Sequence, residues 1–95
     1  MIEVRQSERF GRWLRALKDQ RAVARIATRI ARLERGAFGD VKYFDGIGEL
    51  RIDYGPGYRV YLVRTGDVVV VLLCGGDKSS QRRNIARARD MAKEV

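Results

Sequence analysis

Residues 48–64 read GELRIDYGPGYRVYLVR, and this stretch decides the fold. Apolar and polar side chains alternate before and after Gly55–Gly57, a pattern that is typical of strands with one buried face. Glycine and proline favour tight turns, so Gly55–Gly57 predicts a hairpin that joins a strand over 49–54 to a strand over 58–64.

The polar face of this hairpin carries the residues that can do chemistry. We expect Tyr54 to pair with Tyr58 across the turn. In that register Asp53 lies opposite Arg59, and opposed side chains in an antiparallel pair are ~5 Å apart. The predicted cluster on the polar face comprises Arg51, Asp53, Arg59 and Tyr61, whereas Leu50, Ile52, Val60 and Leu62 face the core.

Two amphipathic helices precede the hairpin. Ser7 predicts the start of the first, because its side-chain oxygen can accept a backbone N–H, and Phe10 and Trp13 follow on one apolar face. Asp19 predicts the start of the second helix, and Gly36 predicts its end because glycine readily adopts the left-handed conformation. We therefore expect a helical hairpin whose aromatic residues lie in the core.

Three further segments have the pattern of strands. A short strand is expected over 2–6, and the apolar stretch 68–74 is expected to be a central strand covered on both faces. Residues 41–45 could form another strand, followed by a turn or bulge at 46–48.

The last segment predicts a C-terminal helix capped by Ser79 or Ser80. The expected order is β-α-α-β-β-β-α, which makes an α+β fold. It consists of an antiparallel sheet with an N-terminal helical hairpin and a C-terminal helix. A chain of 95 residues is long enough for one domain, so we expect a single domain over 1–95.

The charge of the chain favours a polyanionic partner. It has 20 Lys plus Arg against 12 Asp plus Glu, which gives a formal net charge of +8. Most of the basic residues are arginine, whose planar fork binds two phosphate oxygens at once. We therefore expect nucleic-acid or ribosome binding, and the alternative is a soluble protein that merely has a high isoelectric point.

Composition excludes several classes of function. Histidine is absent and Cys74 is the single cysteine, so neither a Cys/His zinc site nor proton transfer by histidine is available. One cysteine forms no internal disulfide, which suits the cytosol. The longest apolar run, 68–74, is far shorter than the ~20 residues that span a membrane. We expect a cytoplasmic protein with no cofactor, no metal and no membrane contact, in which Cys74 packs in the core.

The polar face of the hairpin suits a phosphodiester. Arg51 and Arg59 could stabilise the extra negative charge that develops when a ribose 2′-hydroxyl attacks the adjacent phosphorus. Such a cut needs no metal ion, but a base must take the hydroxyl proton. The candidate bases are Lys78, Lys42, Tyr61, Asp53 and Glu49. A plain cross-strand ion pair between Asp53 and Arg59 is the alternative interpretation.

Other basic and aromatic residues extend the predicted RNA-binding surface. The second helix carries a stripe formed by Arg21, Arg25, Arg29 and Arg32, for which a solvated helix face is the alternative. Gly75–Ser80 precedes a helix but lacks the spacing of a nucleotide-binding phosphate loop. The residues assigned to RNA binding are Lys42, Tyr61, Arg82, Arg83, Arg21 and Arg25.

Three runs of sequence resemble a known family. They are Gly48–Ile52, Gly55–Tyr61 and Leu72–Gln81, and residues 33–40 and Lys42 fit the same pattern. Together they resemble the HigB-like toxins of the RelE/ParE superfamily of addiction modules. The likeness covers most of the chain, and it rests on the combination of the runs because no single run is specific.

This resemblance implies a toxin of a type II toxin–antitoxin system. Toxins of the RelE and HigB kind cleave mRNA in the ribosomal A site and so stop translation. The resemblance also implies a cognate antitoxin, commonly a helix-turn-helix DNA-binding protein, which holds the toxin inactive. In such systems the toxin reaches operator DNA only through the antitoxin.

The resemblance also suggests roles for particular residues. Arg59 matches the arginine of the family's Gly-Tyr-Arg motif, which stabilises the transition state. Arg51 lies near a basic catalytic position on the preceding strand, and Lys78 lies near a basic residue after the last strand. The catalytic set implied is therefore Arg51, Arg59 and Lys78. Glu49 departs from the pattern, because RelE has a lysine there, and no tyrosine follows Tyr61.

Two other functions remain open at this point. ParE-type relatives share the fold but poison DNA gyrase by binding it, with no cleavage chemistry of their own. A non-catalytic RNA-binding module is the third hypothesis.

Overall fold

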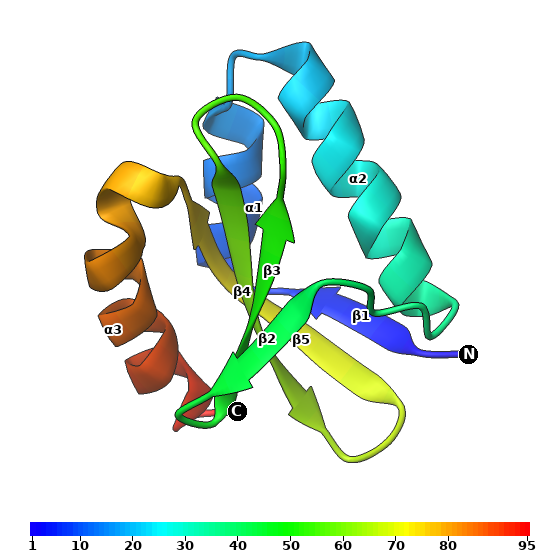
Figure 1. The fold of residues 1–95 in the computed structure, drawn as a ribbon. Coiled ribbons are helices and arrows are strands. Elements are labelled where there is room, and N and C mark those ends of the chain that lie inside the picture. Colours follow the sequence, from blue (N-terminus) through cyan, green and yellow to red (C-terminus); the bar gives the residue numbers. More distant parts are fainter.

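The computed structural model describes all of residues 1–95 and consists of one five-stranded sheet with helices on both faces (Figure 1). The strands are β1 (Glu3–Gln6), β2 (Val41–Phe44), β3 (Ile47–Ile52), β4 (Tyr58–Thr65) and β5 (Val69–Gly76). The helices are α1 (Glu8–Ala16), α2 (Gln20–Glu34) and α3 (Gln81–Ala92), and a short 3-10 turn over Lys78–Ser80 precedes α3. No helix has both the length and the apolar character needed to cross a membrane.

The strands are arranged in the order β1-β5-β4-β3-β2. Strands β2 to β5 form an antiparallel meander, whereas β1 pairs in parallel with β5 at the edge of the sheet. The α+β class, the helical hairpin and the C-terminal helix are confirmed. The expected element order is wrong in its strand count, because 41–44 is a strand and four strands therefore follow the helical hairpin.

The turn between β2 and β3 is shorter than expected. The sequence suggested a turn or bulge at 46–48, but Ile47 and Gly48 already belong to β3. The turn consists of Asp45 and Gly46, whose φ angles are +52° and +81°. Two successive residues with positive φ are what a tight antiparallel hairpin requires, because their twist matches that of the flanking strands.

The two helix starts predicted from sequence are confirmed. The Ser7 hydroxyl oxygen accepts the N–H of Phe10 at 3.0 Å. The same hydroxyl donates to the carbonyl of Leu73 at 2.6 Å, which ties the start of α1 to strand β5. The Asp19 carboxylate caps α2, and Gly36 follows the end of that helix with a φ of +81°, as its position predicted. Ser80 is the N-cap residue of α3, as predicted, but it makes no side-chain capping bond to that helix, and Asp77 caps the 3-10 turn before it.

Two hydrophobic cores lie on opposite faces of the sheet, and α3 covers the face opposite to α1 and α2. Trp13 is half-buried against the larger core, and Cys74 is buried in the smaller one, as expected. The larger core contains Phe10, Ile26, Leu33, Leu50, Ile52, Val60, Leu62, Val70 and Leu72. The smaller core contains Ile47, Tyr61, Leu73, Cys74 and Ala88.

A β-bulge in β5 changes which of its residues face α3. Leu62 pairs with Leu72 and Tyr61 pairs with Cys74, so Leu73 is the extra residue on the bulged strand. Leu73 and Cys74 therefore both lie in the core beneath α3. After the bulge, Gly75 faces the ring of Trp13.

The contact between Gly75 and Trp13 leaves no room for a side chain. The Gly75→Ala variant is expected to lower the free energy of unfolding by about 1–3 kcal/mol, since overpacking displaces neighbouring groups. The added Cβ would lie 2.4 Å from ring atoms of Trp13. Urea denaturation measures the loss. In a double-mutant cycle, Trp13→Leu is expected to relieve the clash, and strictly additive losses would contradict this assignment.

Candidate functional site

The register of the β3–β4 hairpin places two arginines side by side. Arg51, and not Asp53 as the sequence predicted, lies directly opposite Arg59. The predicted register is wrong by two residues, because a longer loop over 53–57 connects the strands. A shift by two residues keeps every side chain on its expected face, but it removes Asp53 from the position opposite Arg59.

A polar pocket of about 550 Å³ opens over this arginine pair. Its residues come from the start of β2, the end of β3, the loop between β3 and β4, and the start of β4. They are Asp40, Val41, Lys42, Arg51, Ile52, Asp53, Gly57, Tyr58 and Arg59. Nowhere in the chain do three Asp, Glu or Cys side chains lie together as a metal-binding group. The pocket offers three cationic groups to a ligand, from Lys42, Arg51 and Arg59, beside the carboxylates of two aspartates.

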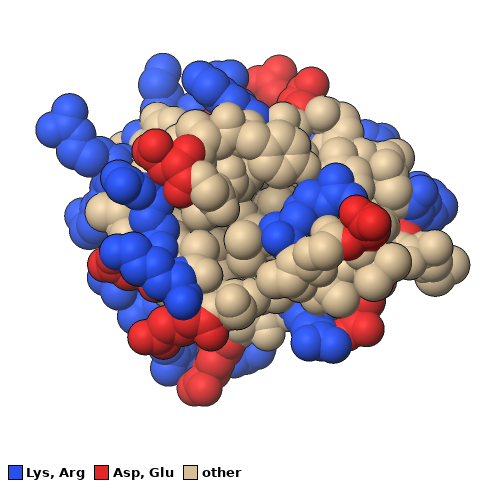
Figure 2. All heavy atoms as spheres, turned by 90° about the horizontal axis from the view of Figure 1, so that it is seen from below, with Lys and Arg blue, Asp and Glu red and all other residues tan.

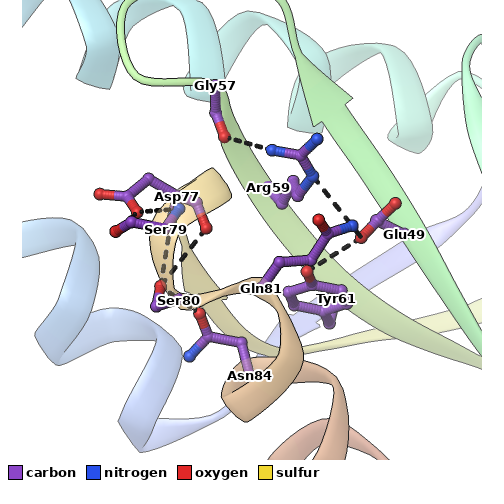
Figure 3. Close-up of polar contacts among 9 residues, drawn as sticks. All are labelled: Glu49, Gly57, Arg59, Tyr61, Asp77, Ser79, Ser80, Gln81 and Asn84. Carbon is purple, nitrogen blue, oxygen red and sulfur yellow. Dashed lines mark hydrogen bonds and ion pairs between the residues drawn. The ribbon is translucent and has the colours of Figure 1, made fainter.

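Arg59 is the buried member of the arginine pair, with 6% of its surface exposed. Figure 3 shows its guanidinium group between two anchors, with Nη1 donating to the Gly57 carbonyl at 2.7 Å. Its Nε lies 3.7 Å from a carboxylate oxygen of Glu49, beyond hydrogen-bond distance, and has no hydrogen-bond partner. The remaining nitrogen, Nη2, makes no hydrogen bond within the protein, so it is free to bind a ligand in the pocket.

Glu49 lies beneath Arg59 and is 3% exposed. Its Oε2 accepts hydrogen bonds from the Tyr61 hydroxyl and from the side-chain amide of Gln81, both at 2.9 Å (Figure 3). A buried carboxylate is tolerated only when it is paired and hydrogen-bonded. Glu49 is therefore engaged in holding β3, β4 and α3 together and in orienting Arg59.

Tyr61 is fully buried, so the prediction that it contacts RNA is wrong. The sequence placed it on the polar face of the sheet, and α3 packs over that part of the face. Burial, followed by the hydrogen bond to the Glu49 carboxylate, raises the pKa of Tyr61 above its ordinary value. Its hydroxyl therefore keeps its proton at neutral pH and is unsuited to act as a base.

Lys78 lies beside the pocket rather than in its lining. Its backbone N–H donates to the carbonyl of Pro56 at 3.4 Å, which places the exposed side chain next to the hairpin loop. A Cβ added to Gly57 would lie 3.6 Å from the Cβ of Lys78, and Gly57 itself lines the pocket. Arg82, on α3, is exposed and lines neither this pocket nor the hollows described below.

The basic stripe on α2 continues the positive surface of the pocket. Arg29 Nη1 donates to the carbonyl of Arg51 at 2.7 Å, and the Arg25 guanidinium lies 4.6 Å from the centre of the Tyr54 ring. A hollow of about 260 Å³ is lined by Arg25, Thr28, Arg29, Arg32, Ile52 and Asp53. It shares its last two lining residues with the pocket. Arg21 is exposed in the first turn of α2 and lies outside this hollow.

A third hollow, of about 350 Å³, lies between α1 and α3 and was not predicted from the sequence. We call it the α1–α3 groove, and among the residues assigned to RNA binding it contains only Arg83. Its lining comprises Arg9, Arg12, Trp13, Cys74, Gly75, Arg83, Asn84 and Arg87. Burial raises the pKa of the Cys74 thiol to about 11, so this floor residue is a neutral group and a poor nucleophile near pH 7.

Removal of the buried carboxylate is expected to destabilise the fold strongly. Glu49→Ala is expected to lower the free energy of unfolding by about 3–5 kcal/mol, because Arg59 would remain as a buried charge without its counter-charge. Urea denaturation measures the change. Glu34→Ala, which removes an exposed carboxylate, is the control and is expected to change stability by less than about 0.5 kcal/mol. Equal effects of the two substitutions would contradict this role of Glu49.

The raised pKa of Tyr61 predicts a loss of stability at alkaline pH. The unfolded chain releases the Tyr61 proton near pH 10, whereas the folded chain retains it. The free energy of unfolding is therefore expected to fall as the pH rises above about 10. The phenylalanine of the Tyr61→Phe variant cannot ionise, so this variant is expected to show a smaller fall in the free energy of unfolding above this pH. Urea denaturation at a series of pH values measures the change. The same slope in both proteins would show that Tyr61 does not contribute.

The chain has a close relative in Haemophilus influenzae. A protein of Haemophilus influenzae, described only as an uncharacterised protein, is 52% identical to this chain over 95 residues. The match covers 99% of this chain and 96% of that protein. No protein-family model and no solved structure matches the chain. Because the identity is high over nearly the whole of both sequences, the chain belongs to the same protein family as this Haemophilus influenzae protein.

Proposed function

We propose that this protein is the toxin of a type II toxin–antitoxin system and acts as a ribosome-dependent mRNA endoribonuclease. The observation that carries the proposal is the position of Arg51 directly opposite Arg59 over an open pocket. Like charges at opposed positions of a sheet are destabilising. A fold that nevertheless brings them together is suited to bind an anion between them, as a phosphodiester would.

The pocket and the α2 stripe offer a path for an RNA backbone. The free Nη2 of Arg59 and the exposed Arg51 side chain would bind the non-bridging oxygens of the phosphate to be cut. Lys42 lines the same pocket, and Arg25, Arg29 and Arg32 line the hollow that adjoins it. These side chains would hold neighbouring phosphates, which fix the position of a strand without reading its sequence.

The proposed reaction is an attack of the ribose 2′-hydroxyl on the adjacent phosphorus. Asp53, a carboxylate in the pocket lining, would accept the hydroxyl proton as the bond between O2′ and phosphorus forms. The bond from phosphorus to O5′ breaks, and Lys78 at the pocket rim would give a proton to the leaving O5′. The products are a 2′,3′-cyclic phosphate and a 5′-hydroxyl. Arg51 and Arg59 stabilise the charge that accumulates on the phosphoryl oxygens.

The partners belong to the same proposal. The sequence resemblance to HigB-like toxins supports a cognate antitoxin that is a helix-turn-helix DNA-binding protein. The toxin would reach operator DNA only through this antitoxin. The net charge of +8 supports a site of action on the ribosome and its mRNA. The antitoxin and the ribosome would both place the protein in the cytoplasm.

The proposal predicts cuts in mRNA that depend on the arginine pair. In primer-extension assays on a defined mRNA, with and without ribosomes, the wild-type protein is expected to make new cuts only when ribosomes translate. Arg51→Ala and Arg59→Lys are expected to lower the cleavage rate about 10²–10³-fold, because each removes a contact to the transition state. Arg64→Ala is the control, since Arg64 is an exposed arginine of β4 outside the pocket.

The variants also distinguish the alternatives. Full cleavage by Arg51→Ala, an exposed residue whose loss leaves the core intact, would contradict the proposed site. Intact mRNA in cells that stop growing when the protein is induced would favour a gyrase poison instead. Within the nuclease mechanism, Asp53→Asn is expected to lower the cleavage rate, because an amide cannot accept the proton of the 2′-hydroxyl.

A further inference from the structure

The α1–α3 groove lies at the end of β5, away from the polar pocket. Strand β1 pairs with β5 only as far as Leu72, so the last four residues of β5 have no strand neighbour on that side. The two helices flank this open edge. Gly75 and Cys74 form part of the floor, and the pocket over Arg51 and Arg59 shares none of the groove's residues.

Four arginines line the groove, two from each helix, and none of the lining residues is acidic. Arg9 and Arg12 are three residues apart on α1, and Arg83 and Arg87 are four apart on α3, so each pair presents one helix face. Only Arg12 forms an ion pair, with Glu8 at 3.4 Å at the surface. Figure 2 shows Lys and Arg side chains gathered along the side of the molecule on which α3 lies in Figure 1.

We propose that the α1–α3 groove is a second RNA-binding site, which holds backbone phosphates without cutting them. Three guanidinium groups, those of Arg9, Arg83 and Arg87, have no carboxylate partner, so the groove concentrates positive charge that a polyanion would neutralise. Each planar guanidinium can bind two phosphate oxygens. The side-chain amide of Asn84 adds a polar group to the same wall.

The lining favours RNA over an acidic protein segment. Stable protein interfaces are anchored by exposed aromatic or aliphatic side chains at their centre. The large exposed hydrophobic residues of this chain are Met1, Tyr43, Val68 and Val95, and none of them lines the groove. Trp13, the one aromatic residue in the lining, is half-buried against the larger core. A polar, strongly positive surface of this kind is typical of protein–nucleic acid interfaces.

This site goes beyond the proposed cleavage. The groove and the pocket lie on separate surfaces of the protein. RNA bound at both would therefore fix the orientation of the protein on a folded RNA. The phosphates bound in the groove would contribute affinity that depends on salt and not on base sequence.

Trp13 provides a direct readout because it lines the groove and is the single tryptophan of the chain. Its fluorescence is followed while the full-length protein is titrated with a short single-stranded oligouridylate at several salt concentrations. All proteins carry Arg51→Ala, which weakens binding in the polar pocket, and the remaining charges of that pocket are the same in every variant compared. We expect a saturable change in Trp13 fluorescence.

Two double variants of α3 test the groove with the same change in net charge. Arg83→Gln with Arg87→Gln removes two groove charges, whereas Arg89→Gln with Lys93→Gln removes two charges outside the groove. The first is expected to weaken binding about tenfold and to lower the slope of log affinity against log salt by about 1.4. The second is expected to weaken binding by less than about twofold.

Three results would overturn the proposal. The first is an equal loss of affinity in the two double variants, and the second is a Trp13 fluorescence that RNA does not change. The third is a polyglutamate peptide that binds as tightly as RNA and whose binding is lost when the groove charges are removed. The last result would identify a docking site for an acidic protein. Failure of the proposed nuclease function would instead show as intact mRNA in the primer-extension assay, with this titration unaffected.

Discussion

The buried carboxylate of Glu49 is the interaction on which the arrangement of the site depends. It receives hydrogen bonds from β4 and α3 while its own residue belongs to β3, so one side chain joins three elements. It is also the ion-pair partner of buried Arg59. This ion pair includes no hydrogen bond, so Nε of the Arg59 guanidinium has no hydrogen-bond partner. The fold thus tolerates a buried arginine and leaves part of its binding capacity for a ligand.

Much of the fold follows from local patterns, and the errors have definite physical origins. The side-chain period identified both strands of the central hairpin, and the capping residues Ser7 and Asp19 identified the starts of two helices. The sequence pattern could not determine the register of the hairpin. A two-residue shift leaves each side chain on the same face, so the hydrophobic pattern is the same in both registers. The parallel edge strand β1 is four residues long, and nothing within it indicates its partner.

The candidate site was only partly visible in the sequence for the same reason. Arg51, Arg59 and Lys42 were found because strand pairing brings them to one surface. Tyr61 was misplaced, because its alternation with core residues suggested an exposed face that α3 in fact covers. The α1–α3 groove depends on how two helices distant in sequence meet across a sheet edge. No spacing within either helix encodes that meeting, so Arg9 and Arg87 gave no local signal.

The bulge at Leu73 has a consequence for how this family can diverge. The bulge determines which face of the sheet each following residue of β5 points to. As a result, one glycine, Gly75, meets Trp13 on one face, and another, Gly76, meets the start of α3 on the other. Loss or gain of one residue here would exchange the two faces and drive side chains into both helices. Substitutions that conserve size are compatible with this geometry, whereas gaps are not. Related sequences should therefore align through residues 72–77 at constant length, even where the identity of individual residues has drifted.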